Sequence, residues 1–430
     1  MTTPNLPEIS SLLVNRNRCH SLMQQNKVDA IVCSQPENIY YLTNYYPALS
    51  KMGLQNLDYA ILPLNPAEPP ILVIGQYEYF LAAAEAISNM DIDVRLFTFP
   101  EDPEKFFQAN SIKEQWNAKA LASTLPKAHE LKPLNQSESF RRENTLQKSA
   151  HLGVNCELTL LKSLKDIRLN FKRLAIDNAA LEPIIQKLEL GIDFTNGEQL
   201  LRRVRLEKTA PEVELMRFAA NANAQAAVIA AQSARSGATL YEIRKEYFTQ
   251  CARHSLTPNF MLIDNIDVMD PNAEIEEGRS FLIDCVSAAH HYHGDYGRTV
   301  CVGEPTKEIQ KATKSISKVW DELLPQLKPG MYYSEISAIA TDIFNDGPSD
   351  ASFICSPHSV GLHHTDEPSA NGSNYFAKDD LELLEGMVLS VDLPVIDAGL
   401  GGSAHLEDLV LITDDGAELL NDSDNRVIIV

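Results

Sequence analysis

The chain lacks the cysteine patterns that build disulfide frameworks or zinc-thiolate sites. Its seven cysteines are odd in number, scattered, and include no C-x-x-C pair. Cysteines used in this way are typical of a reducing compartment. The first residues, MTTPNLPEISS, also carry neither the basic flank nor the apolar core of a secretion signal. We therefore expect a cytoplasmic protein.

Long apolar runs and positive charge are also scarce. The sequence contains no stretch of about 18 apolar residues, the length that a membrane-spanning helix needs. It has 37 lysines and arginines against 59 aspartates and glutamates, which gives a net charge of −22. Such an excess of negative charge opposes binding to a phosphate backbone. We expect neither a membrane nor a nucleic acid as a partner.

The remaining composition is that of a globular protein with more than one domain. A length of 430 residues with 44% hydrophobic residues leaves room for two or three domains. Between residues 28 and 99, short strand-like runs alternate with helix-like segments, which predicts an α/β domain. Residues 173–177 predict a late strand of that domain. We place the boundary near Arg205, so that the domains are residues 1–204 and 205–430.

The second domain opens with a helix signal and contains a short internal repeat. Thr209 and Glu212 form the pattern of a capping box, with a proline just inside the helix start. The helix that follows is rich in alanine and is expected to end at Gly237. The pattern G-x₄-E-I occurs at Gly237 and again at Gly330, each time between two helical segments. This repeat predicts two related halves that face one another across a cleft.

Two aspartates are embedded in the apolar stretch of residues 280–303. The stretch reads as two apolar runs joined by a polar, turn-rich segment, which predicts a β-hairpin. The two runs are Phe281 to Val286 and Thr299 to Val302. Asp284 lies inside the first run and Asp295 precedes the second. A carboxylate in an apolar setting needs a partner, and a metal ion would keep both ionised. The alternative is a turn acid at Asp284 and an ion pair between Asp295 and Arg298.

Three later residues supply the donors that a metal site at these aspartates would still lack. His358 lies in SPHSVGLHHTDEP, Asp392 ends the run MVLSVD, and Glu407 begins EDLVLIT. Oxygen ligands with one imidazole suit Mn²⁺, Co²⁺, Fe²⁺ or Zn²⁺. Four carboxylates with one histidine are enough for two ions about 3.5–4 Å apart. The predicted metal ligands are Asp284, Asp295, His358, Asp392 and Glu407.

Histidines gather in the last third of the chain. Seven of the eleven lie there, which suits metal ligation and proton transfer near neutral pH. They are His290, His291, His293, His358, His363, His364 and His405. For each one apart from His358, a histidine in the wall of the fold is the simpler interpretation. His364 and His405 are retained as candidate catalytic residues.

As a set, these motifs resemble those of the creatinase, aminopeptidase P and prolidase superfamily. The resemblance extends upstream through RLEKTAPEVELMRFA and VDAIVCSQPENIYYLTNYY. It implies an α+β protein with an N-terminal creatinase-like α/β domain and a C-terminal pita-bread domain that has a pseudo-twofold internal repeat. It also implies a homodimer, in which the segment containing Asn38, Tyr41 and Thr43 closes over the partner's site. The alternative for that segment is a plain loop with aromatic packing.

The resemblance further implies a hydrolase of the Xaa-Pro dipeptidase or aminopeptidase P type. In these peptidases divalent metals, here expected as a pair with Mn²⁺ favoured, hold a hydroxide and polarise the scissile carbonyl. An acidic ligand, Asp392 or Glu407, would act as general base. His364 and His405 would then steady the tetrahedral intermediate.

Several departures from the family pattern leave other functions open. The penultimate acidic ligand, usually glutamate, is Asp392, and the second histidine seven positions after His358 is replaced by Thr365. The upstream segment DNIDVMDPN contains no histidine, and His405 stands where an arginine is common. One alternative is a small non-peptide substrate, as in creatinase-like, ectoine hydrolase-like or DMSP lyase-like members. A third is an inactive binding homologue.

Overall fold

The structure is a computed structural model that divides into two compact units. These units are Ile9–Val204 and Arg205–Val430, and residues 6–8 group with the second. The described residues are 6–109, 111–121, 125, 135–167, 172–264, 272–369, 379–399, 402–421 and 425–430. Within these ranges no helix has both the length and the apolar character needed to cross a membrane.

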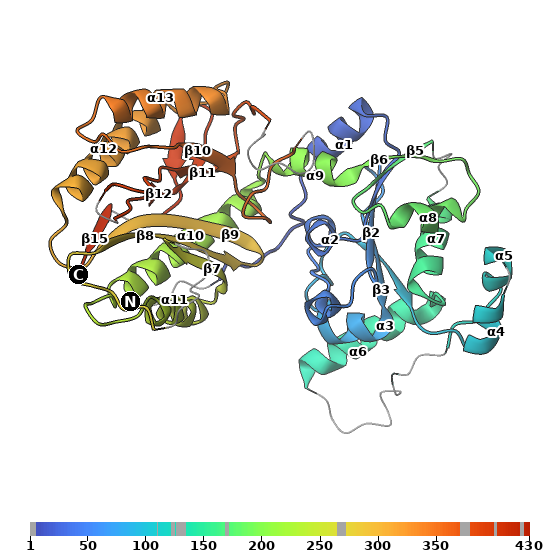
Figure 1. Cartoon of the computed structure of the whole chain (residues 1–430). Coiled ribbons are helices and arrows are strands. Elements are labelled where there is room, and N and C mark those ends of the chain that lie inside the picture. Colours follow the sequence, from blue (N-terminus) through green and yellow to red (C-terminus); the bar gives the residue numbers. More distant parts are fainter. Residues whose placement is uncertain are drawn as a thin grey trace. The chain divides into compact units, whose positions relative to one another are not determined.

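The first unit is built on a six-stranded sheet with strand order β4-β3-β2-β1-β5-β6 (Figure 1). Its strands are β1 Ala30–Cys33, β2 Tyr59–Pro63, β3 Ile71–Gly75, β4 Asp93–Phe97, β5 Arg173–Ile176 and β6 Asp193–Asn196. Its helices are α1 Arg16–Gln25, α2 Pro36–Thr43, α3 Gln76–Glu78, α4 Pro103–Gln108, α5 Ile112–Gln115, α6 Gln136–Lys148, α7 Cys156–Asp166, α8 Leu181–Gln186 and α9 Gly197–Arg205. The predicted α/β character and the late strand at residues 173–177 are confirmed.

The segment that contains Asn38, Tyr41 and Thr43 forms helix α2, so the plain-loop alternative is wrong. Pro36 occupies the first turn of the helix, where a missing N–H costs nothing. Asp177 accepts hydrogen bonds from the backbone N–H groups that directly precede helix α2. It also accepts one from Asn38 Nδ2, at 3.0 Å. All three predicted side chains are buried. Their contribution to a partner's site stays a prediction.

The second unit contains two sheets, each covered by a pair of helices (Figure 1). A five-stranded sheet has the order β12-β9-β8-β7 with β15 beside β9, and a four-stranded sheet has the order β10-β11-β13-β14. The strands are β7 Thr257–Ile263, β8 Ser280–Ala289, β9 Tyr292–Cys301, β10 Ser356–Ser359, β11 Val388–Asp392, β12 Leu406–Glu407, β13 Leu409–Ile412, β14 Ala417–Leu419 and β15 Val427–Ile429. The helices are α10 Ala210–Ala231, α11 Leu240–Arg253, α12 Lys307–Leu323 and α13 Tyr333–Asn345. One hydrophobic core joins α10 and α11 to the first sheet, and another joins α12 and α13 to the second.

The internal repeat corresponds to two equivalent helix starts. Gly237 and Gly330 both have positive φ angles, +79° and +90°, which favour glycine. Two residues after each glycine, a residue begins α11 or α13 with a glutamate side chain bonded back to its backbone. In each half, two helices are followed by strands. The capping box at Thr209 is confirmed, but α10 ends at Ala231, and turns carry the chain from there to Gly237.

The predicted hairpin is present, but its strands are longer than the two apolar runs. Strands β8 and β9 pair from Ser280 with Cys301 to Ala289 with Tyr292. The turn consists of His290 and His291 alone, both with positive φ, as a type I′ turn requires. Most of the segment that was expected to form the turn lies inside the two strands, including Gly294 and Gly297 in β9. A Cβ on Gly294 would lie 2.6 Å from the backbone oxygen of Ala219 on α10, so this glycine permits close helix packing.

Candidate metal centre

Three of the predicted ligands lie on one face of the five-stranded sheet. Asp284 on β8 and Glu407 on β12 both pair with Gly297 of the central strand β9, from opposite sides. Asp295 lies two residues before Gly297 and pairs with Val286. Side chains alternate between the faces of a strand, so all three carboxylates share one face.

The four-stranded sheet supplies the other two predicted ligands. His358 on β10 pairs with Ser390 of β11, and Asp392 pairs with Ser356, so the histidine and aspartate are diagonal neighbours. His358 Nε2 lies 3.7 Å from Asp295 Oδ2 and 3.6 Å from Asp392 Oδ2. The structure therefore brings the five predicted residues together. Their role as ligands stays a prediction.

The donor atoms at this centre lack the hydrogen bonds that buried polar groups normally make. Within the described part of the chain, Asp284 Oδ1, both Asp295 carboxylate oxygens and both His358 ring nitrogens are buried without a hydrogen bond. Such atoms are costly in a protein interior unless something else satisfies them. Three triplets hold donor atoms within 4.8 Å of one another: Asp295, His358 and His364; His358, Asp392 and Glu407; and Asp284, Asp295 and Glu407. These residues fit a pair of divalent cations.

Electrostatics at the centre point to the same need for positive charge. Burial, followed by repulsion from neighbouring carboxylates, raises the pKa of both Asp284 and Glu407 well above their ordinary values. Burial would also raise the pKa of Asp295 and Asp392, but adjacent histidines lower both below the ordinary value. Four carboxylates cannot all ionise this close together without cations.

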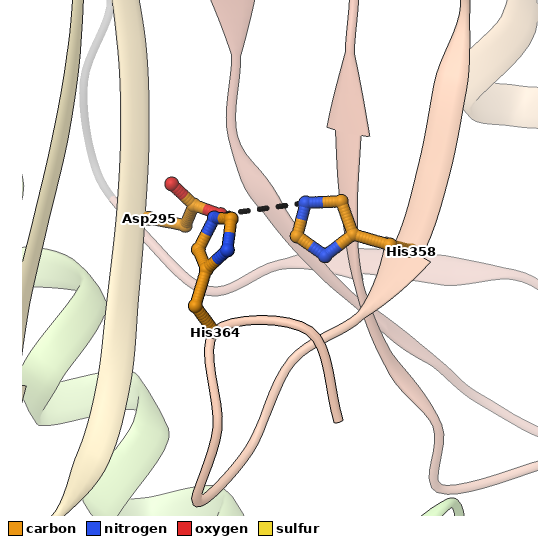
Figure 2. Close-up of side chains that lie close together, drawn as sticks. All are labelled: Asp295, His358 and His364. Carbon is orange, nitrogen blue, oxygen red and sulfur yellow. Dashed lines mark ion pairs between the residues drawn. The ribbon is translucent and has the colours of Figure 1, made fainter. Parts of the chain in front are cut away.

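Both candidate catalytic histidines reach the cluster. His364 Nε2 lies 3.1 Å from Asp295 Oδ2, and Figure 2 shows its ring beside that carboxylate, with His358 turned toward the same oxygens. Burial lowers the pKa of His364, but the charge of Asp295 outweighs it and raises the value to about 9. His405 Nε2 lies 3.0 Å from Glu407 Oε2. Burial lowers the pKa of His405.

The other histidines of the group lie outside the donor triplets. His290 and His291 form the hairpin turn, and His293 is buried in the wall, with Nδ1 3.1 Å from Gly361 O. Burial lowers the pKa of His293 to about 4. His363 precedes His364 but belongs to none of the triplets. The upstream segment DNIDVMDPN lies almost wholly outside the described residues.

The alternative ion pair between Asp295 and Arg298 is wrong. Arg298 Nη2 instead donates to Asp408 Oδ1 at 2.7 Å, and Nη1 donates to the backbone oxygen of Glu407 at 2.7 Å. Ser390 Oγ donates to Glu407 Oε1 at 2.5 Å. Sequence reasoning missed two of these residues, Asp408 and Ser390, which position the groups around Glu407. Asp408 had a signal, since it directly follows the predicted ligand, whereas Ser390 had none beyond its place in the strand.

Sequence reasoning also missed Gly297, which lies on β9 between the strands that carry Asp284 and Glu407. A Cβ at this position would lie 2.1 Å from His405 Nε2 and 2.8 Å from Glu407 Oε2. The side chains of β12 therefore occupy the space above the glycine. The available signal was a glycine inside a strand, which often marks close approach.

The loop that carries His364 is fastened by a buried ion pair. Arg205 donates to both oxygens of Asp366, at 2.8–3.1 Å, and both side chains are almost fully buried. Burial raises the pKa of Asp366, but the Arg205 guanidinium holds it well below the ordinary range. Asp366 Oδ2 also accepts the N–H of Leu362 at 3.2 Å. The loop is thereby fixed on both sides of His364.

A cavity of about 1030 Å³ opens beside the centre. Asp284, Asp392 and His405 form part of its wall. Its apolar wall residues include Leu262, Leu282, Ile354, Pro357, Pro394 and Ile396. None of the described residues that line it is a lysine or an arginine. The volume suits a small organic molecule or a short peptide.

Comparison with known families assigns both halves of the chain. A model of metallopeptidase family M24 matches residues 214–414, and a model of the creatinase/prolidase N-terminal domain matches residues 16–132. The chain therefore combines a creatinase/prolidase N-terminal domain with a domain of metallopeptidase family M24. The expected creatinase-like N-terminal domain and the C-terminal pita-bread domain are confirmed.

Several relatives of the chain are peptidases by name. The chain is 26% identical over 253 residues to an Xaa-Pro dipeptidase of Pyrococcus furiosus, covering 55% of this chain and 69% of that protein. It is 23% identical to an Xaa-Pro dipeptidase of Pyrococcus horikoshii over 94% of this chain and 96% of that protein. The match to the probable dipeptidase PepE of Mycobacterium tuberculosis spans 65% of that protein at 24% identity.

Solved structures show the same fold at lower identity. The prolidase of Pyrococcus furiosus superposes with a TM-score of 0.63 at 19% identity, over 94% of this chain and 99% of that one. An X-Pro aminopeptidase of Thermotoga maritima gives a TM-score of 0.65 at 15% identity, over 97% and 99% of the two chains. Similarity at this level supports the fold but does not identify a substrate.

Proposed function

We propose that this protein is a metal-dependent hydrolase of the Xaa-Pro dipeptidase and aminopeptidase P type. The observation that carries the proposal is the convergence of four carboxylates and one histidine, among which Asp284, Asp295 and His358 have buried donor atoms without hydrogen bonds. Membership of a metallopeptidase family gives this arrangement a chemical context. The substrate would be a small peptide held in the cavity beside the centre.

In this proposal Asp284, Asp295, His358, Asp392 and Glu407 hold two divalent ions. Mn²⁺ is favoured because oxygen donors outnumber nitrogen donors among these five, and Co²⁺, Fe²⁺ or Zn²⁺ are the alternatives. Bound ions would supply a water of lowered pKa and would polarise the scissile carbonyl.

The chain's own residues would then move the proton and stabilise charge. Asp392 or Glu407 accepts the proton of the attacking water, and the Ser390 hydroxyl fixes the orientation of the Glu407 carboxylate. His405, in the cavity wall, donates to the oxygen that becomes negative in the tetrahedral intermediate. His364 was expected to share that task, but its position 3.1 Å from Asp295 Oδ2 supports a different role.

Two further features belong to the proposal. All seven cysteines are free, which is consistent with a reducing compartment such as the cytoplasm. A homodimer is proposed from the family resemblance. Light scattering on the purified protein would test the dimer, with a mass near 48 kDa, that of one chain, contradicting it.

The experiment that tests the function is proline release from a panel of Xaa-Pro dipeptides by protein loaded with Mn²⁺. The wild type should release proline, whereas an Asp392→Ala variant, which loses a ligand and a candidate base, should not. Asp415→Ala, at an exposed turn, is the matched control and should behave as wild type. Equal release by wild type and Asp392→Ala would refute the assigned site.

A second candidate is a superfamily member that acts on a small non-peptide metabolite. It is favoured by Thr365, where the peptidase pattern has a histidine, and by the absence of lysine and arginine among the described cavity residues, which leaves a peptide carboxylate without a basic partner there. Turnover of a small amidine, cyclic amide or sulfonium acid without proline release would select it. Bound metal without turnover of any of these would select the third candidate, an inactive binding homologue.

A further inference from the structure

His364 lies beside Asp295 in an arrangement that differs from a hydrogen bond. Its Nε2 is 3.1 Å from Asp295 Oδ2, yet neither oxygen of Asp295 accepts a hydrogen bond within the described part of the chain. The contact between His405 and Glu407 is equally short, at 3.0 Å, and does have hydrogen-bond geometry.

Two atoms bound to one metal ion have this kind of separation. Donors about 2.1 Å from an ion lie about 3.0–3.4 Å apart when the angle at the ion is near 90–110°, and at most about 4.2 Å apart. The separation of His364 Nε2 from Asp295 Oδ2, 3.1 Å, is in the first range. The separation of His358 Nε2 from the same oxygen, 3.7 Å, is below the upper limit. Figure 2 shows the three side chains converging from three directions.

The other nitrogen of His364 has the partner that a metal-binding histidine normally has. Nδ1 lies 3.4 Å from the hydroxyl oxygen of Thr365, and a proton on Nδ1 leaves the lone pair on Nε2. Second hydrogen bonds of this kind fix the tautomer and orientation of ligand histidines. Phe260 packs edge-on against the ring, with centroids 5.5 Å apart. The ring is therefore held in place before any ion binds.

We propose that His364 is itself a metal ligand, so that Asp295, His358 and His364 hold one of the two ions. This rests on the metal-dependent part of the proposed function and is independent of the substrate. With Asp392 beside His358 at the first ion, the second ion is left with carboxylates alone, Asp284, Asp295 and Glu407. Two imidazoles favour Zn²⁺ or Co²⁺, whereas an all-oxygen site favours Mn²⁺. The two positions consequently differ in metal preference, and the centre holds one ion of each kind when both are supplied.

The test is metal binding, measured on chelator-treated full-length protein by calorimetric titration with Zn²⁺ alone and with Mn²⁺ alone. His364→Ala should weaken Zn²⁺ binding at one position by at least about tenfold, because a ligand is lost. Mn²⁺ binding at the other position should change little. His363→Ala is the matched control, since the neighbouring histidine belongs to none of the donor triplets, and it should bind as wild type.

Two further measurements exclude a merely structural effect. His364→Asp supplies an oxygen donor instead of nitrogen, and should restore binding while shifting preference from Zn²⁺ towards Mn²⁺. X-ray absorption on the Zn²⁺-loaded protein should show fewer imidazoles per ion in His364→Ala than in wild type. Unchanged Zn²⁺ affinity or an unchanged imidazole count in His364→Ala would overturn the proposal. Weakened Zn²⁺ binding in His364→Ala, with no proline release by the wild type, would support the ligand and refute only the proposed peptidase activity.

Discussion

The buried negative charge of Asp366 is stabilised by a residue that lies far away in the sequence. It is fully buried and receives the Arg205 guanidinium, 161 positions away in the chain. Replacing it by asparagine would remove the charge that this buried guanidinium contacts through both carboxylate oxygens. We expect Asp366→Asn to lower the free energy of unfolding of the second unit by about 3–5 kcal/mol, measured by chemical denaturation.

An exposed ion pair provides the comparison. Arg217 and Glu418 are 2.9 Å apart, but a third of one side chain and half of the other are exposed. Solvent weakens such pairs, so Glu418→Gln should change the free energy of unfolding by less than about 1 kcal/mol. Equal losses in the two variants would show that burial does not set the strength of these pairs.

Asp58 in the first unit makes stability depend on pH in an unusual direction. Burial, reinforced by the charge of Glu78, raises its pKa to about 8, from an ordinary value of 3.8. Between these values the folded protein holds a proton that the unfolded chain releases. Stability contributed by this group is therefore fully present below the ordinary value and is lost as pH rises towards 8. Asp58→Asn cannot ionise and should lose this dependence.

Hydrogen exchange in strand β2, which follows Asp58 directly, can measure the effect. After correction for the intrinsic exchange rate, wild-type protection should fall as pH rises from about 5 to about 8.5, whereas protection in Asp58→Asn should stay flat. An identical fall in both proteins would assign the pH dependence to another group.

At the scale of single elements, the approach of β12 to β9 depends on Gly297. An alanine there would push His405 and Glu407 away, because the added carbon falls within 2.1 Å and 2.8 Å of their atoms. We expect Gly297→Ala to weaken metal binding at least about tenfold through displaced ligands, while circular dichroism stays unchanged. At Gly416, in the β13–β14 turn, an added Cβ would meet nothing within 4 Å, so Gly416→Ala should bind metal normally. Tight metal binding by Gly297→Ala would show that β12 can move away from β9 without displacing the ligands.

Elements were predictable from sequence where a local pattern decides them. The capping box at Thr209 and the strand at residues 173–177 follow from neighbouring residues, and the structure contains both. The long turn in the hairpin was wrong because Gly294 and Gly297 serve packing against other elements, which local pattern does not reveal. The four candidate carboxylate ligands were found because carboxylates inside or beside apolar runs are anomalous. The pairing of Arg205 with Asp366 had no local signal, since the partners meet only in the fold.

At the scale of the whole molecule, the candidate metal site belongs to one unit. Every predicted ligand, His364, His405 and the described cavity residues lie between Arg205 and Val430. A ligand that binds only the folded state stabilises what it binds, by about 2.7 kcal/mol at a hundredfold excess over its dissociation constant. Metal should therefore slow hydrogen exchange in β8, β9 and β11 of the second unit and leave the β1–β6 sheet of the first unchanged.

Mass spectrometry of exchange with and without Mn²⁺ would measure this unit by unit. His358→Ala, which removes a donor that belongs to two of the three triplets, should lose most of the protection in the second unit. The first unit has its own sheet and core, so nothing within it depends on the ion. Equal protection of both units by metal would mean that their folding is coupled. Protection confined to residues 205–430 would instead mean that the centre is complete within a single unit of the chain.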